Sequence, residues 1–93
     1  MADPSAVPFD AAAPWRLSPE VSLRDEPFGA LAYHHRNRRL VFLKTRELAS
    51  LVTCLDQYDN ADRALDALVE VSARASYLRA LGSLADAGII RDR

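Results

Sequence analysis

The chain has 93 residues, with twelve Lys and Arg against thirteen Asp and Glu and a net charge of −1. This length allows one small domain and excludes multi-domain enzymes and folds that need roughly 200 residues or more. The balanced charge argues against a general nucleic-acid binder, and the single cysteine, Cys54, excludes an intramolecular disulfide framework and a multi-cysteine zinc site. No apolar run approaches the ~18 residues of a membrane span and no secretory signal is seen, so we expect a cytoplasmic protein with no membrane partner.

The first fourteen residues differ in composition from the rest. They hold three of the five prolines, with Val7 and Phe9 as their only larger apolar residues. Such a segment has little to bury, so we expect residues 1–14 to be a disordered or loosely packed tail and residues 15–93 to form the domain.

The first half of the domain predicts three strands. Residues 20–24 alternate between apolar and polar side chains, which is typical of a half-buried strand, and Asp25–Gly29 predicts a turn. Residues 30–35 form the second predicted strand. Arg36-Asn37 is the predicted hairpin tip, because Asn tolerates the positive φ of tight turns, and residues 38–43 are the third predicted strand.

The second half changes to a helical period. Thr45 is a predicted N-cap, Asp59-Asn60 caps a second helix, and Ser72 or Ser76 starts a third. Gly88 lies where a glycine commonly ends a helix. Strands followed by helices predict an α+β fold: a three-stranded antiparallel sheet followed by three helices, with helices on one face.

The sequence offers no persuasive catalytic or metal site. His34 and His35 are neighbours on a predicted strand, so they point to opposite faces and cannot readily bind one metal; an exposed strand end explains them. Cys54 is interpreted as a small, half-buried apolar residue of the first helix rather than a nucleophile. The three glycines are isolated and form no phosphate-binding loop.

The third strand is the most informative element. In a three-stranded meander it has one open edge, and its interior, Leu40–Leu43, carries none of the charges, prolines or bulges that usually protect such an edge. An apolar open edge beside a helix favours strand addition by an extended peptide. The alternative is that the third helix or the N-terminal tail covers it. Basic residues from Arg36 to Arg46 lie around this strand, either as a solvated hairpin tip or to recognise an acidic partner.

Several stretches resemble a known family. Residues 23–34 (LRDEPFGALAYH), 38–44 (RRLVFLK), 77–81 (YLRAL) and 84–90 (LADAGII) are similar to the small peptide-binding chaperones of mycofactocin biosynthesis. The resemblance covers roughly Trp15 to Arg93. It implies a RiPP recognition element, the winged helix-turn-helix-like fold that the pyrroloquinoline quinone peptide chaperones also have.

The resemblance also implies a function. Such domains bind the leader of a precursor peptide as a fourth strand, along the third strand and against the third helix. This chain would hold the mycofactocin precursor peptide for a radical SAM maturase with iron–sulfur clusters, and would carry no cofactor and no catalytic residue itself. The candidate peptide-binding residues are Arg38, Arg39, Leu40, Val41, Phe42, Leu43, Arg74, Tyr77, Leu78 and Leu81. Leu40 and Phe42 would point one way and Val41 and Leu43 the other, and either pair could join the core.

Two other classes fit the elements. A winged-helix DNA-binding regulator would need a basic recognition helix, whereas the third predicted helix offers only Arg74 and Arg79 against Asp86. An oligomerisation domain would use the open strand for self-pairing and would be a dimer without peptide.

Overall fold

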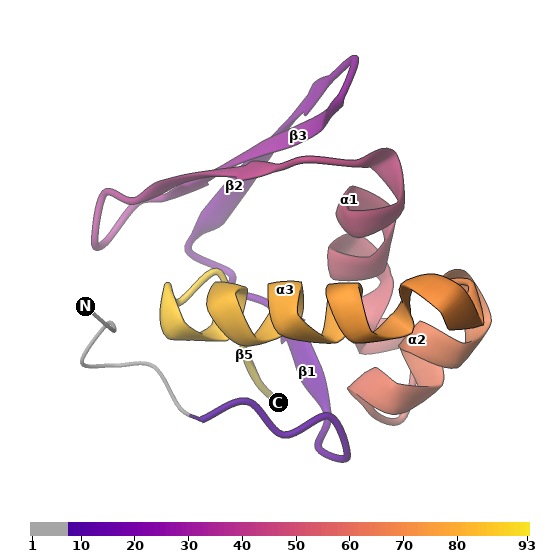
Figure 1. The fold of residues 1–93 in the computed structure, drawn as a ribbon. Coiled ribbons are helices and arrows are strands. Elements are labelled where there is room, and N and C mark those ends of the chain that lie inside the picture. The colour runs from indigo at the N-terminus through magenta and orange to yellow at the C-terminus, as the bar shows by residue number, and fades with distance from the viewer. Residues whose placement is uncertain (1–7) are drawn as a thin grey trace.

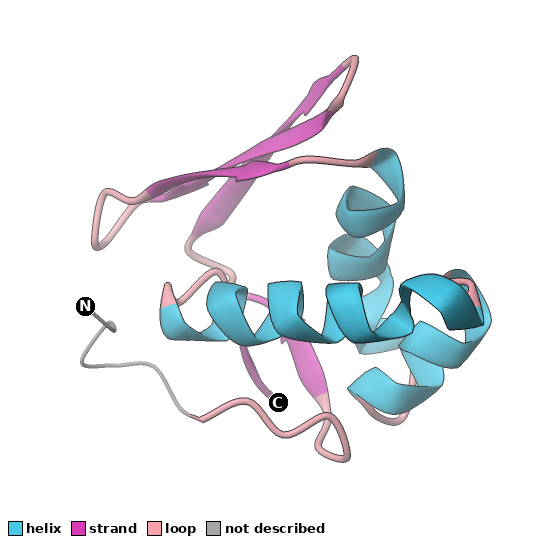
Figure 2. Cartoon of the chain, viewed as in Figure 1, coloured by secondary structure: helices cyan, strands magenta, loops and turns pink. Residues whose placement is uncertain are grey.

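The computed structural model describes residues 8–93, and Figure 1 traces their path. The elements follow in the order β1 (Trp15–Leu17), β2 (Val21–Glu26), β3 (Gly29–His34), β4 (Leu40–Leu43), α1 (Arg46–Cys54), η1 (Leu55–Gln57), α2 (Ala61–Leu68), η2 (Val71–Ala73), α3 (Arg74–Asp86) and β5 (Ile90–Asp92). The fold is α+β, as predicted, with a three-stranded sheet on one side of the helices (Figure 2). Among the described residues, no helix has the length and apolar character needed to cross a bilayer.

The three-stranded sheet is an antiparallel meander in the order β2-β3-β4. Val21 pairs with His34 at one end of β2, and Tyr33 pairs with Leu40 where β3 meets β4. Gly29 begins β3 so close to the following chain that a β-carbon there would lie 2.1 Å from the carbonyl oxygen of Leu43. Only glycine therefore allows β3 and β4 to approach each other in this way.

A second, two-stranded sheet was not predicted. Strand β1 pairs with β5, which brings Trp15 opposite Asp92 and Leu17 opposite Ile90. Each strand has three residues. This is too short for an alternating pattern to be detected, and the pairing joins the two ends of the domain.

The helix caps explain where the helices begin and end. The predicted caps are confirmed: Thr45 Oγ1 accepts the Leu48 N–H at 3.0 Å, and Asn60 Oδ1 accepts the Arg63 N–H at 2.8 Å. The predicted serine cap of the third helix is wrong, because α3 follows the η2 turn directly and has no side-chain cap. Gly88 ends α3 with φ 77°, and the Ile89 N–H donates to the Leu84 carbonyl, so the predicted glycine stop is confirmed.

The core lies between the inner face of the meander and the helices. It includes Trp15, Leu43, Leu51, Leu55, Leu65, Leu81, Ile89 and Ile90, all fully buried. Helix α1 packs closely against β3. Much of the core is therefore built from the second half of the chain, closed by the β1–β5 pair.

Residues 8–14 of the predicted tail lie against the domain. Phe9 stacks on Trp15 with ring centroids 5.0 Å apart, and the Trp15 indole N–H donates to the Asp10 carbonyl at 2.7 Å. The carbonyls of Ala11 and Ala13 accept main-chain hydrogen bonds from the first turn of α2. The rest of the predicted tail, residues 1–7, lies outside the described residues.

The turn between β3 and β4 differs from the prediction. Strand β4 begins at Leu40, so Arg38 and Arg39 belong to the turn and not to the predicted third strand. The positive φ falls on Arg38, at 63°, and not on Asn37. Asn37 contributes its side chain instead: its Oδ1 accepts the Arg39 N–H at 3.0 Å, and its Nδ2 donates to the Ala87 carbonyl at 3.2 Å.

A candidate peptide-binding edge

The pairing register of β4 shows which main-chain groups point away from the sheet. The His34 N–H donates to the Arg39 carbonyl and the His34 carbonyl accepts the Arg38 N–H, so His34 forms a hydrogen-bonded pair with Arg38 and Arg39 together. Such pairs alternate along an antiparallel ladder, which makes Val41 and Leu43 the next residues that bond to β3. The N–H and C=O groups of Leu40 and Phe42 therefore point to the open edge.

The two faces of β4 are clearly different. Val41 is half-buried against the core and Leu43 is fully buried, whereas Leu40 and Phe42 are both 55% exposed. The structure thus answers the question that the sequence left open: Val41 and Leu43 are the inner pair. Leu40 and Phe42 carry both the exposed side chains and the outward main-chain groups.

Two hydrogen bonds tie α3 along β4. Before the strand, the Asn37 side-chain amide donates to the Ala87 carbonyl at the end of α3. After the strand, the Thr45 and Tyr77 hydroxyl groups lie 2.9 Å apart. The two elements therefore run alongside each other in opposite directions, as Figure 1 shows, and these bonds set their spacing at both ends.

The side of α3 that faces β4 follows from these bonds. Tyr77 and Ala87 mark its two ends, and the helical period places Ala80 and Leu84 between them. We call these four residues the α3 stripe. Leu84 is buried, while Ala80 is half-buried and has the smallest side chain possible beyond glycine. The middle of the stripe therefore carries its smallest side chain at Ala80.

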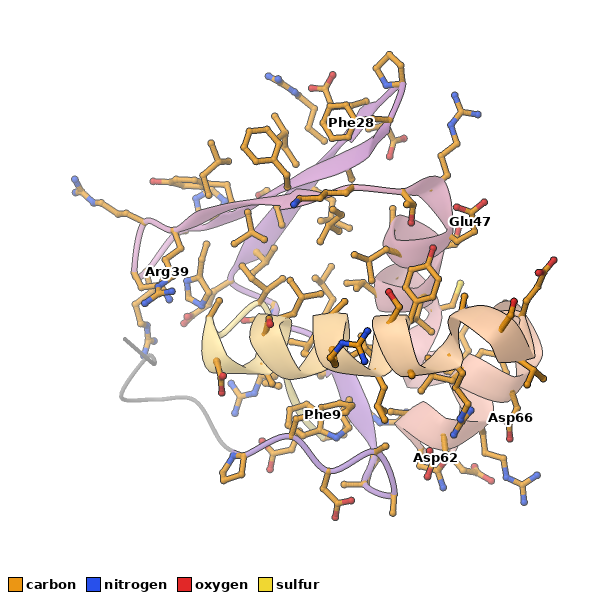
Figure 3. The ribbon with its side chains drawn as sticks, in the orientation of Figure 1. Phe9, Phe28, Arg39, Glu47, Asp62 and Asp66 are labelled. Carbon is orange, nitrogen blue, oxygen red and sulfur yellow. The ribbon has the colours of Figure 1, made fainter. Side chains whose placement is uncertain are left out.

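The predicted site residues on α3 have different environments. Leu81 is fully buried in the core, and Leu78 is half-buried against it. Tyr77 is half-buried, with its hydroxyl group on Thr45. Arg74 forms ion pairs with Asp62 and Asp66 of α2, so its guanidinium group links the two helices (Figure 3 labels both acids). Of the predicted residues on α3, the structure thus brings Tyr77 to β4.

The basic residues cluster at the start of β4. Arg38 and Arg39 are exposed in the turn, where Figure 3 labels Arg39. Arg36 lies two residues before Arg38 and forms an ion pair with Glu20 at 2.6 Å. Arg38 and Arg39 would therefore lie at one end of a chain bound along β4 and would not contribute to its ladder.

His34 organises this turn from inside. The structure confirms that the two histidines point to opposite faces, but His34 is buried at 5% exposure, so the prediction of an exposed strand end is wrong for it. Its Nδ1 accepts the N–H groups of Arg36 and Asn37 at 3.2 and 3.3 Å. His35 is exposed and bonds to Ser22. Cys54 is half-buried, as predicted.

Asn37, Thr45 and Ala80 were not among the predicted site residues. Asn37 was predicted to be a turn residue, and Thr45 was predicted to be a helix cap. Each also forms a hydrogen bond to α3, Asn37 with Ala87 and Thr45 with Tyr77. These partners are 50 and 32 residues away in sequence. A local pattern carries no signal for these two bonds. The i, i+3, i+7 spacing from Tyr77 is the signal that could have identified Ala80, together with Leu84, on the same face.

A match to a protein-family model identifies the class of this protein. Residues 14–91 match the model of the peptide chaperone MftB family. Its role is therefore that of a peptide chaperone, which is not catalytic. The match spans most of the chain, and the chain belongs to the MftB peptide chaperone family.

Three relatives show how far the similarity extends. The peptide chaperone MftB of Mycolicibacterium smegmatis is 41% identical over 85 residues, which cover 90% of this chain and 83% of the relative. That of Mycobacterium tuberculosis is 41% identical over 86 residues, covering 91% and 79%. That of Mycobacterium ulcerans is 44% identical over 78 residues, covering 83% and 72%. No solved structure matches the chain significantly.

Proposed function

We propose that this protein binds the leader of the mycofactocin precursor peptide as a fourth strand on the open edge of β4, and presents the peptide to a radical SAM maturase with iron–sulfur clusters. The observation that carries the proposal is the edge of β4. Its outward main-chain groups, on Leu40 and Phe42, belong to a strand with no charge and no proline. Such an edge is a template for another extended chain.

The α3 stripe would give the bound peptide its second contact surface. Side chains of an added strand alternate between the two faces of the sheet. Those next to Val41 and Leu43 would point toward α3, where Ala80 is the small residue between Tyr77 and Leu84. Main-chain bonds would supply affinity, and this inner row of side chains would supply selectivity.

In this proposal the chaperone and the maturase have separate tasks. Holding the leader as a strand fixes one part of the precursor and leaves the rest of it accessible to an enzyme. The maturase would carry out the chemistry on that free part. Helix α3 is less suited to recognise DNA, because the guanidinium group of Arg74 is already paired with two carboxylates of α2.

Fluorescence anisotropy with a labelled leader peptide tests this proposal. The leader encoded beside this gene should bind saturably below about 10 μM, which corresponds to roughly −7 kcal/mol, and a scrambled peptide of the same composition should not bind. A folded protein that fails to bind the leader would contradict the proposal.

A pair of variants on α3 locates the binding site. Ala80→Leu enlarges the side chain in the middle of the α3 stripe and should weaken leader binding by about tenfold, since it would crowd an inner side chain of the peptide. Ala75→Leu makes the same change at an exposed position on another side of the helix and should leave binding unchanged. Equal affinities for the two variants would place the peptide elsewhere.

A further inference from the structure

The face of the meander that points away from the helices carries an exposed apolar patch. Register and alternation put Leu31, Tyr33, Leu40 and Phe42 on this face, and Phe28 in the β2–β3 turn extends it. We call these five residues the outer face. Phe28 is 44% exposed, Tyr33 36%, and Leu40 and Phe42 55% each. Figure 3 shows Phe28 on the side of the sheet away from α3.

The outer face is one continuous surface. Leu31 lies opposite Phe42, and Tyr33 lies opposite Leu40, so the central strand β3 and the edge strand β4 present neighbouring side chains. The rings of Phe28 and Phe42 are 6.1 Å apart at their centroids. No described helix packs on this side, since α1 lies against the inner face. Exposed apolar clusters of this kind mark interaction surfaces.

The charges around the outer face indicate the kind of partner. Arg38 and Lys44 are exposed at the two ends of β4. Within the three strands, the acidic residue at an outer-face register position is Glu26, and Arg24 already pairs with it at 2.7 Å. Two copies packed through this face would bring like charges together. A protein with an apolar centre and an acidic rim fits better.

The patch is continuous with the proposed peptide site. Leu40 and Phe42 contribute their side chains to the outer face and their outward main-chain groups to the edge. A peptide added at this edge would place every second side chain on the outer face, next to Leu40 and Phe42. A bound leader would therefore extend the surface of the outer face.

We infer that the outer face is the surface on which the modifying enzyme docks, and that a bound leader completes it. The inference rests on the proposed function. The enzyme would contact the aromatic patch of the chaperone and the outward side chains of the leader together. It would therefore bind the peptide-loaded chaperone more tightly than the empty one, and by linkage would tighten the hold on the leader.

The test uses a double variant that leaves β4 intact. Phe28→Ser with Tyr33→Ser removes two aromatic rings from the outer face but none of the outward main-chain groups of β4. Val71→Ser is the control, because Val71 is an apolar residue that is 90% exposed in the η2 turn. Two titrations are run on each protein: labelled leader by anisotropy, and then the purified maturase on the leader-loaded chaperone.

We expect the double variant to bind the leader within about twofold of wild type and the maturase at least about tenfold more weakly, because truncated aromatic anchors dominate interface losses. The preference of the maturase for the loaded chaperone should shrink as well. Val71→Ser should match wild type in both titrations.

Three outcomes would overturn the inference, and they can be told apart. Undiminished maturase binding by the double variant would place the enzyme elsewhere. A wild-type dimer that the double variant abolishes, seen by light scattering, would make the outer face a self-association surface. A wild-type chaperone that does not bind the leader would overturn the proposed function, and this inference with it.

Discussion

The meander has two open edges, and they are built differently. Half of the residues of β2 are charged, at Arg24, Asp25 and Glu26, and prolines lie before and after the strand. Strand β4 reads Leu-Val-Phe-Leu, without a charge. Charges and prolines are the usual protection of an edge strand against pairing with another chain. The sheet is therefore protected against pairing at the edge of β2 and unprotected at the edge of β4.

The surfaces that lie beside the two edges also differ. Beside β2, a hollow whose lining includes Asp25, Arg46 and Ser50 lies between the sheet and α1. Beside β4, the α3 stripe presents Tyr77, Ala80 and Leu84, and hydrogen bonds to Asn37 and Thr45 hold the helix in place. A strand added at β4 would lie beside the α3 stripe, whereas one added at β2 would lie beside a hollow that includes the charged side chains of Asp25 and Arg46.

The largest expected effect comes from removing β4 from the sheet. Gly29→Ala would put a β-carbon 2.1 Å from the Leu43 carbonyl oxygen and 2.8 Å from that of Thr45. Both neighbours are main chain, so we expect a loss of about 3 kcal/mol of unfolding free energy or more, together with loss of leader binding. Urea unfolding followed by circular dichroism measures the first effect.

Gly82→Ala is the matched control, because nothing lies within 4 Å of a β-carbon there. It should stabilise α3 by about 0.5–1 kcal/mol. A Gly29→Ala protein as stable as wild type would show that β3 and β4 do not need this close approach.

The next effect sharpens the contrast by giving β4 the protection that β2 has. Phe42→Pro removes one outward N–H at an edge position, where proline is tolerated, and also removes the phenyl ring. Phe42→Ala removes the ring alone. We expect the proline variant to bind the leader about tenfold more weakly than the alanine variant in anisotropy titrations.

Equal affinities for the two Phe42 variants would argue against strand addition. A proline at Val41 is the less informative choice, because Val41 bonds inward to β3 and its replacement would disturb the sheet itself.

A smaller effect should come from loosening α3 beside the β4 edge. Tyr77→Phe removes the hydroxyl group that lies 2.9 Å from Thr45 Oγ1 and keeps the ring. One hydrogen bond contributes about 1 kcal/mol to stability, and Thr45 keeps its capping bond to Leu48. We expect a loss of that size in thermal or urea unfolding. An unchanged stability would show that the spacing of α3 and β4 does not depend on this bond.

The smallest effect is expected from the two arginines just before β4, since β4 itself contains no charged residue. Arg38→Glu with Arg39→Glu should slow the association of an acidic leader severalfold and reverse or remove its salt dependence, with little change in the dissociation rate. Stopped-flow association at several salt concentrations measures this. An on-rate that is the same as wild type at every salt concentration would assign the two arginines to solubility alone.

Local patterns were enough to predict much of the fold. Alternation located β2, the helical period located α1 and α2, and the caps at Thr45 and Asn60 and the stop at Gly88 are each determined by a few neighbouring residues. The β1–β5 sheet was missed because its strands have three residues each and its pairing depends on the whole domain having folded.

The candidate site was predictable in part for the same reason. The apolar sequence of β4 showed that its edge was unusual, but not which face Val41 and Leu43 would take. That depended on helix α1, which packs against the inner side of the sheet. Arg74 was a reasonable candidate by position, and only the tertiary structure shows its ion pairs with Asp62 and Asp66.

The pairing of β1 with β5 has a consequence for the order of folding. Trp15 and Asp92 lie near opposite ends of the domain's sequence, so their pairing closes a long loop, which is entropically costly until the intervening chain is compact. The β2-β3-β4 meander and helix α1 are built from contacts between neighbours in sequence, which form quickly. We therefore expect the edge of β4 to form early in folding and the two-stranded sheet to form late.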